Sequence, residues 1–170
     1  MQLKNYVRDI SDFPKPGIIF KDITPLLGDT YAFAKAADSL FELVRDLNID
    51  KVVGIESRGF FFGALLAQRL NTGFIPVRKP GKLPYDTIAQ TYDLEYGTDT
   101  LEIHLDAIKT GEQVLLHDDV LATGGTAEAV VKLIEAAGGI VVQCNFLMEL
   151  SFLNGRERLS GYDVQAVLKY

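Results

Sequence analysis

The sequence predicts an α/β protein built on a doubly wound, mostly parallel sheet. From residue 31 onward, short apolar runs of strand length alternate with longer segments whose apolar residues recur at helical spacing, which is the pattern of consecutive β–α units. Neither a repeat nor a Pro/Gly-rich linker interrupts the 170 residues, a length that suits one domain with a sizeable core. We therefore expect a single domain over residues 1–170, with a distinct N-terminal segment (1–30) and an inserted hairpin (82–105).

Local signals predict the individual elements. Residues 31–47 carry apolar side chains at helical spacing, and Asp29 or Thr30 suits the N-cap of that helix. The elements expected after it are a strand at Lys51–Glu56, a helix at Phe60–Leu70, strands at Phe74–Arg78 and Gln113–Asp118, a helix at Thr126–Ala137, and strands at Ile140–Leu150 and Asp163–Leu168.

Three polar loops, at residues 57–59, 79–82 and 118–126, each follow a predicted strand. The carboxyl ends of parallel strands lie at one edge of a sheet, and ligands of open α/β sheets bind beyond that edge. We therefore expect the three loops to converge on one site.

Residues 82–105 interrupt the alternation. Two β-prone runs, Thr87–Tyr96 and Thr98–His104, surround Gly97 and predict a hairpin inserted between core strands. The polar residues that punctuate these runs are Gln90, Asp93, Glu95, Asp99 and Glu102. Its faces are too polar for a core element, so we expect a mobile flap over the site.

The segment Val114–Ala127 carries the most specific chemistry. An apolar strand is followed by two carboxylates, Asp118 and Asp119, then by a Gly-Gly loop, and then by a helical pattern. The loop consists of Ala122, Thr123, Gly124, Gly125 and Thr126. Glycines let the backbone approach a ligand closely, and the N-terminus of a helix favours a phosphate. Carboxylates repel a phosphate but accept hydrogen bonds from hydroxyl groups or hold Mg²⁺. Together these features suggest a 5-phosphorylated ribose.

Other interpretations of this segment remain open from the residues alone. A strand, a glycine-rich loop and a helix start recur in many α/β proteins. The segment has neither the lysine of a P-loop nor the glycine spacing of a dinucleotide-binding fingerprint, which makes a Rossmann dinucleotide module a weak alternative.

A second cluster is cationic. Arg78, Lys79 and Lys82 follow one predicted strand, and Arg58 follows another. Such a run is commonly a solvated surface, but its position at two strand ends favours a role in the site. Arginine and lysine directed at a diphosphate stabilise the charge that builds as it leaves.

Composition narrows the function classes. With 48% hydrophobic and 24% charged residues, the chain reads as an ordinary globular protein, and its net charge of −6 argues against nonspecific nucleic-acid binding. We see no signal peptide and no apolar run of the roughly 20 residues that a membrane span needs. The single cysteine, Cys144, lies in an apolar run and is expected to be a buried thiol. A cytoplasmic location fits these features.

Five motifs, taken in order, resemble those of the adenine phosphoribosyltransferases, members of the type I phosphoribosyltransferase family. Besides the Asp-Asp and Thr-Gly-Gly-Thr signature at 118–126, they are DFPKPGIIFKDITP at 12–25, GIESRGF at 54–60, RKPGKLP at 78–84 and LEYG at 94–97. The resemblance extends over nearly the whole chain and implies the type I phosphoribosyltransferase fold, with a hood at 1–30 and a flap at 82–105.

The resemblance also implies roles in binding 5-phosphoribosyl-1-diphosphate (PRPP). The loop Ala122–Thr126 is expected to hold the 5-phosphate, and Asp118 and Asp119 the ribose hydroxyls. The residues implied for the diphosphate are Ser57, Arg58, Arg78, Lys79 and Lys82. Members of the family commonly have a cis peptide bond in this loop, which here is Glu56–Ser57. Mg²⁺ is expected as a cofactor held mainly by the substrate, with Asp118 and Asp119 as available protein ligands.

The remaining implied roles concern the base. Ile19, Phe20 and Val120 would enclose a purine ring, and backbone groups at Ile19 and Lys21 would read its edge, although by themselves Ile19 and Phe20 suit core packing. Glu95 would accept the adenine N9 proton. Tyr96 would cover the closed site.

The implied reaction converts adenine and PRPP to AMP and diphosphate through an oxocarbenium-like transition state, in a homodimer that binds neither nucleic acid nor membrane. Two alternatives stay open: a phosphoribosyltransferase for a 6-oxo purine, and a regulator that binds PRPP without reacting it. His117 stands where an aliphatic residue is typical, and we expect it to point away from the site.

Overall fold

The computed structural model describes residues 2–94 and 97–170. The described chain divides into two compact units, one ending at Ser39 and the other spanning Leu40–Tyr170. Each unit is described by itself. Within the described residues, no helix has both the length and the apolar character needed to cross a bilayer.

The first unit is built around a two-stranded antiparallel hairpin, in which Arg8 pairs with Asp22 and Ser11 with Ile19. Its elements are a 3₁₀ helix at Leu3–Tyr6, β1 at Arg8–Ser11, β2 at Ile19–Asp22, α1 at Thr24–Gly28, and the start of α2 at Thr30–Glu42. The Asp29 carboxylate accepts the Ala32 N–H at 2.8 Å, which confirms Asp29 as the N-cap of α2.

Helix α2 ends at Glu42, earlier than the predicted 47. The N–H groups of Leu43, Val44 and Leu47 donate to carbonyls three residues earlier, so the chain continues as tight turns in place of α-helix. The apolar spacing persists through these turns, which is why the sequence suggested a longer helix.

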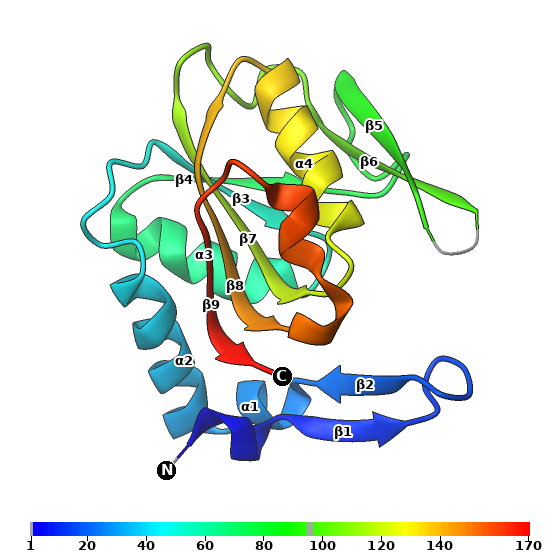
Figure 1. Ribbon diagram of the computed structural model, residues 1–170. Coiled ribbons are helices and arrows are strands. Elements are labelled where there is room, and N and C mark those ends of the chain that lie inside the picture. Colours follow the sequence, from blue (N-terminus) through cyan, green and yellow to red (C-terminus); the bar gives the residue numbers. More distant parts are fainter. Residues whose placement is uncertain (1, 95–96) are drawn as a thin grey trace. The chain divides into compact units, whose positions relative to one another are not determined.

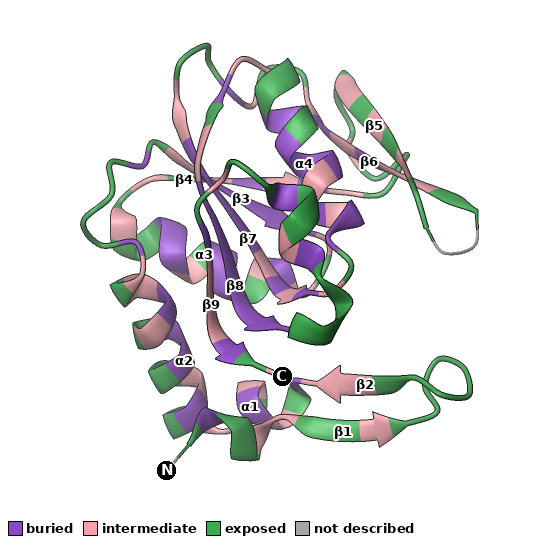
Figure 2. Cartoon of the chain, viewed as in Figure 1, coloured by how far each residue is buried: buried purple, intermediate pink, exposed green. Residues whose placement is uncertain are grey.

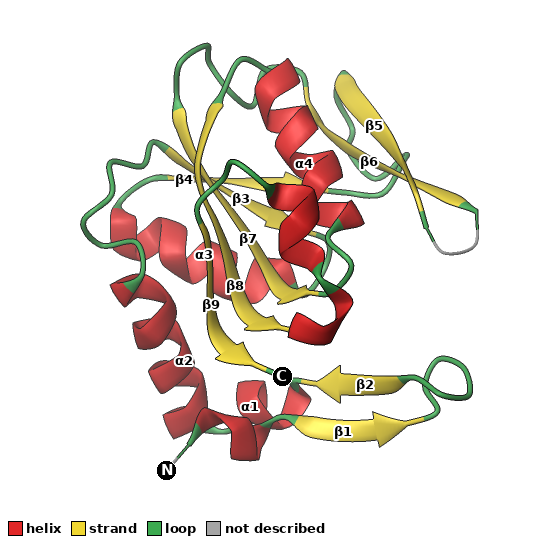
Figure 3. Ribbon diagram, viewed as in Figure 1, coloured by secondary structure: helices red, strands yellow, loops and turns green. Residues whose placement is uncertain are grey.

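The described residues of the second unit form a five-stranded sheet in the order β4-β3-β7-β8-β9, with every neighbouring pair parallel (Figures 1 and 3). The elements are β3 at Lys51–Ile55, α3 at Gly59–Leu70, β4 at Gly73–Val77, β7 at Gln113–Leu121, α4 at Gly125–Ala136, β8 at Ile140–Glu149, 3₁₀ turns at Ser151–Leu153 and Gly155–Leu159, and β9 at Val164–Lys169. This architecture confirms the predicted doubly wound parallel sheet.

The strand order reverses between β3 and β7. From β3 the chain moves outward to β4, whereas from β7 it moves in the opposite direction to β8 and β9. Right-handed crossovers in opposite directions place α3 and α4 on opposite faces of the sheet. The loops after β3 and β7 therefore separate at a topological switch point, where ligands of such sheets bind.

The main core lies between the sheet and α4, as the buried residues in Figure 2 show. Val53 and Leu116 of the central strands pack there with Val130 and Ile134 of the helix. On the other face of the sheet, Gly54 and His117 lie under α3. Gly63 of this helix packs so closely there that its position has little space for a side chain.

The inserted hairpin exists as predicted, with β5 at Thr87–Asp93 pairing antiparallel with β6 at Thr98–His104. The expectation that it is too polar for the core was wrong for β6, because Leu101 and Ile103 are only 2% and 0% exposed and belong to the main core. The polar residue between them, Glu102, points to the opposite face of the strand, so Leu101 and Ile103 form an apolar stretch of one face despite the mixed composition.

The backbone also ties the hairpin to the parallel sheet. The Arg78 N–H donates to the Glu102 carbonyl at 3.0 Å, and the Glu102 N–H donates back at 2.8 Å. The base of the hairpin is therefore a fixed part of the second unit.

Replacing Ile103 by Ala should lower the free energy of unfolding by about 2–5 kcal/mol, because it leaves a cavity in the core under β6. Urea denaturation measures the effect. The control is Thr98→Ala, an exposed position on the same strand that should change stability by less than about 0.5 kcal/mol. Equal stability of the two variants would show that β6 does not contribute to the core.

Candidate functional site

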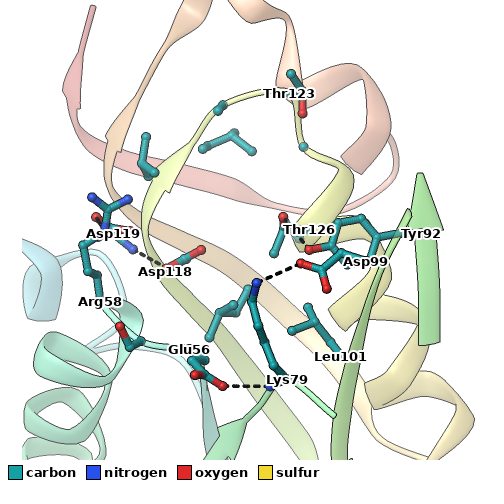
Figure 4. Close-up of a pocket in the computed structure, with 17 residues that line it drawn as sticks. Glu56, Arg58, Lys79, Tyr92, Asp99, Leu101, Asp118, Asp119, Thr123 and Thr126 are labelled. Atoms are coloured by element: carbon teal, nitrogen blue, oxygen red, sulfur yellow. Dashed lines mark hydrogen bonds and ion pairs between the residues drawn. The ribbon is translucent and has the colours of Figure 1, made fainter. Parts of the chain in front are cut away.

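A cavity of about 440 Å³ lies beyond the carboxyl ends of β3 and β7 (Figure 4). The loops that follow β3, β4 and β7 all contribute to it, which confirms that the three predicted loops converge. The lining residues are Ile55, Glu56, Ser57, Arg58, Lys79, Tyr92, Asp99, Leu101, Asp118, Asp119, Val120, Leu121, Ala122, Thr123, Gly124, Thr126 and Ala127.

The glycine-rich loop occupies one side of the cavity and leads directly into α4. Gly124 is the N-cap residue, with φ of 85°, and it has no side chain to cap the first turn. The first N–H groups of a helix lack partners within the helix, so this end of α4 offers donors and a positive dipole end to an anion. Of the five predicted loop residues, Gly125 does not line the cavity.

The same loop is packed tightly against the segment after β8. A Cβ atom at Gly124 would lie 2.4 Å from the Gly155 carbonyl oxygen, and one at Gly155 would lie 2.3 Å from the Ala122 carbonyl oxygen. Neither space admits a side chain. Gly155 therefore helps to shape the loop, a contact that no signal near residue 155 revealed in the sequence.

The two carboxylates point to opposite sides of β7 (Figure 4). The strand extends to Leu121, three residues beyond its predicted end, so Asp118 and Asp119 lie within it and alternate in direction. Asp119 is buried and forms an ion pair with Arg58, with its Oδ2 atom 2.8 Å from the arginine Nε. Asp118 is half-buried and points into the cavity.

Both acids are held where a negative charge is costly. Burial, reinforced by the charge of Asp119, raises the pKa of Asp118 well above its ordinary value. Burial also raises the pKa of Asp119, although Arg58 acts in the opposite direction. A cation or hydroxyl donors that bind beside such carboxylates would stabilise their negative charge.

The predicted cations are all close to carboxylates. Lys79 Nζ lies 3.2 Å from Asp99 Oδ2, and the Glu56 side chain accepts hydrogen bonds from Arg78 and Lys82. Lys79 lines the cavity, whereas Arg78 and Lys82 do not. Ser57 also lines it, and the Glu56–Ser57 peptide bond is cis, as the resemblance implied.

The hairpin contributes residues that sequence reasoning missed. Tyr92 and Asp99, which are cross-strand partners, line the cavity together with Leu101. The Thr126 hydroxyl lies 3.4 Å from the Tyr92 hydroxyl, so β5 reaches the start of α4. Asp99 and Leu101 share one face of β6, and the period-two alternation could have indicated that both side chains face the same space.

The residues implied for the base fall in two parts of the chain. Val120 lines the cavity. In the first unit, Ile19 is 55% exposed, which argues against core packing for it. Phe20 packs edge-on against Phe13 with ring centroids 5.2 Å apart, and Lys21 Nζ donates to Asp9 at 2.6 Å. Lys21 therefore has a side-chain partner on the neighbouring strand.

Glu95 and Tyr96, the predicted proton acceptor and cover of the site, lie outside the described residues. His117 is fully buried and is not part of the cavity lining, as expected; its Nδ1 lies 2.9 Å from Asn145 Oδ1. Burial lowers the pKa of His117 to about 4, so the ring is neutral. Cys144 is buried as predicted, and burial raises its pKa to about 12.

Comparison with known proteins identifies the family. The model of the phosphoribosyl transferase domain family matches residues 27–164. The adenine phosphoribosyltransferase of Christiangramia forsetii is 64% identical over 170 residues, covering 100% of this chain and 99% of the relative. The crystal structure of the adenine phosphoribosyltransferase from Rhodothermus marinus has a TM-score of 0.94 at 57% identity, covering 99% of this chain and 96% of that one.

A third similar protein was solved with ligands. The adenine phosphoribosyltransferase of Saccharomyces cerevisiae, complexed with an imino-altritol bisphosphate and adenine, has a TM-score of 0.90 at 42% identity, covering 96% of this chain and 95% of that one. Identity at this level over the full length, together with the loop, carboxylates and cations around one cavity, assigns the chain to the adenine phosphoribosyltransferases of the phosphoribosyltransferase family.

Proposed function

We propose that this chain transfers the 5-phosphoribosyl group of PRPP to N9 of adenine, which yields AMP and diphosphate in purine salvage. The observation that supports the proposal most directly is the cavity, because the glycine-rich loop at the start of α4 and the Asp118 carboxylate face the same space. The family to which the chain belongs and the adenine-bound relative from yeast support the choice of substrates.

The charged groups of PRPP determine which part of the cavity binds each of them. The loop Ala122–Thr126 takes the 5-phosphate through backbone N–H groups, and Asp118 accepts hydrogen bonds from the ribose hydroxyls. Asp119, the next residue, also helps to bind the ribose hydroxyls, and its ion pair orients Arg58. The diphosphate then binds at the cationic side of the cavity, which Arg58, Lys79 and the Ser57 backbone line. Arg78 and Lys82 add positive charge from just outside the lining.

A divalent cation fits this donor set. Glu56, Asp99, Asp118 and Asp119 all line the cavity, so a polyanionic substrate needs additional positive charge to enter it. Within the described residues, no group of three or more His, Cys, Asp or Glu side chains could hold a metal ion alone, so water and substrate oxygens would complete the coordination. Asp118 and Asp119 are the protein ligands available. When bound, Mg²⁺ supplies charge neutralisation at the diphosphate.

The chemistry requires opposite charges at two places. As the bond between C1 and the diphosphate lengthens, positive charge grows on the ribose, and Asp118 provides negative potential beside it. Negative charge grows on the diphosphate, where Arg58 and Lys79 stabilise it. Adenine N9 attacks C1 from the other side and must lose its proton, for which Glu95 is the proposed acceptor.

Roles in binding adenine are proposed for Ile19, Phe20 and Val120, and backbone groups at Ile19 and Lys21 are proposed to read the edge of the base. Tyr96 is proposed to cover the site and to keep water from the reactive ribose cation. Leu101 and Ile103 belong to the core, so the part of the hairpin that carries them is fixed in the second unit.

Compartment and assembly also belong to the proposal. The buried free thiol of Cys144 fits a reducing cytoplasm, and the family resemblance supports a homodimer. The proposal includes neither nucleic-acid nor membrane binding, in keeping with a net charge of −6.

One assay separates the proposed function from its alternatives. With PRPP and Mg²⁺ present, we expect AMP to form from adenine, and chelation of the metal should slow the reaction at least tenfold. Initial rates with hypoxanthine, guanine and xanthine test the 6-oxo purine alternative. Binding of PRPP without any nucleotide product would indicate the regulator instead.

Replacing Glu95 by Leu should reduce turnover by about 10²–10⁴-fold, because the variant lacks the proton acceptor for N9. The affinity for PRPP should change little. Steady-state rates and PRPP titration measure the two effects, and Glu157→Gln, an exposed acid, serves as the control. Normal turnover of the leucine variant would exclude Glu95 as the base.

Asp118→Asn and Asp119→Asn should each weaken PRPP binding and turnover at least tenfold, yet they should differ in stability. Asp118→Asn removes a charge that burial disfavours, so the melting temperature should stay equal or rise. Asp119→Asn deprives Arg58 of its carboxylate and should cost about 1–3 kcal/mol. PRPP titration and thermal unfolding provide the comparison, and unchanged PRPP binding in both variants would remove the ribose assignment.

A further inference from the structure

Glu56 lines the cavity but has no part in the reaction proposed above. It directly follows β3, and its side chain is only 10% exposed. A carboxylate at this place repels the diphosphate that must bind nearby. Its presence in an anion-binding site therefore needs a physical reason.

The contacts of Glu56 supply that reason. Its Oε2 atom accepts hydrogen bonds from the Lys79 backbone N–H at 2.7 Å and from Arg78 Nε at 3.1 Å, and its Oε1 atom accepts one from Lys82 Nζ. Both carboxylate oxygens are thus directed at one short segment, residues 78–82, which follows β4. Figure 4 shows the bond to Lys79 at the lower edge of the cavity.

These bonds keep Glu56 ionised. Burial by itself would raise the pKa of this carboxyl, but the hydrogen bonds from Lys82, Lys79 and Arg78 outweigh it and lower the pKa to about 2. The negative charge at position 56 is therefore permanent at neutral pH. It interacts with the cationic segment in the ligand-free protein.

We propose that Glu56 is a positioning residue that holds segment 78–82, with its backbone and its basic side chains, at the diphosphate side of the cavity. This inference rests on the proposed function and adds a role within the same site. This role needs no contact between the acid and the substrate. It acts by joining the end of β3 to the segment after β4, so that Lys79 reaches the cavity in an ordered backbone.

Glu102 provides a matched control. It bonds to the same segment from the other side, where its Oε2 atom accepts the Gly81 N–H at 3.3 Å. Glu102→Gln removes one negative charge and leaves an amide oxygen that accepts the same N–H. Glu56→Gln also removes one charge, but its amide presents an NH₂ group to donors that need an acceptor.

The experiment measures dissociation constants by calorimetry for two probes, inorganic diphosphate with excess Mg²⁺ and AMP, in the full-length protein. Glu56→Gln should weaken diphosphate binding about tenfold or more, since it disrupts bonds to charged donors. Glu56→Asp, which keeps the charge but is one methylene shorter, should weaken it several-fold. Glu102→Gln should change it less than about twofold, and AMP binding should stay within about twofold in all variants.

Other outcomes overturn the inference. If Glu56 acted only as a repelling charge, Glu56→Gln would bind diphosphate as tightly as the unaltered protein or more tightly. If it were merely structural, diphosphate and AMP would weaken by the same factor. Should Glu56→Gln fail to fold, Glu56→Asp decides, and unchanged diphosphate binding in it rejects the role. An unaltered protein that binds neither probe would contradict the proposed function itself.

Discussion

The reversal of strand order between β3 and β7 is the constraint on which the site depends. Because the chain leaves these adjacent strands in opposite directions, the loops after them separate and leave room at the carboxyl edge of the sheet. Helix α3 starts from one loop and α4 from the other, so one cavity receives Arg58 from the N-cap of α3 and the glycine-rich loop from the start of α4. The cavity follows from topology before any side chain is considered.

Charge pairing then organises what lines this cavity. Arg58 faces Asp119, Lys79 faces Asp99, and Glu56 holds the neighbouring basic side chains. Paired cations keep their side chains ordered without ligand, and they retain donors for an incoming anion. Asp118 faces the open space of the cavity, and burial together with the charge of Asp119 raises its pKa. One side of the site thus contains basic side chains paired with carboxylates, and the other contains an acid that attracts positive charge. The charge separation of the proposed reaction requires this arrangement.

Backbone proximity adds a second kind of order. Gly124 and Gly155 approach so closely that a side chain at either position would overlap a carbonyl group. The loop at the start of α4 is therefore held by the 3₁₀ segment after β8, far away in the sequence. The hairpin reaches the same helix start through Tyr92, while Leu101 and Ile103 anchor it in the core.

The sequence by itself determined the fold class, the order of the strands and helices from residue 31 onward, and the segments that meet at the site. These depend on local apolar periodicity and on glycine and capping residues, which the chain carries in each short window. Ordered motifs also sufficed to identify the family. The cis bond at Glu56–Ser57 was correctly expected from the resemblance, because it belongs to a recognisable loop.

Only the tertiary structure decided which side chains meet. The length of β7 placed Asp118 and Asp119 on opposite sides of the strand, since its pairing with β8 continues past the last apolar residue that the sequence suggested. Burial of Leu101 and Ile103 depended on a core made by distant strands, so the mixed composition of the hairpin was misleading. The partners of Glu56 lie more than 20 residues away and are selected by the parallel pairing of β3 with β4, a long-range register that no local pattern encodes.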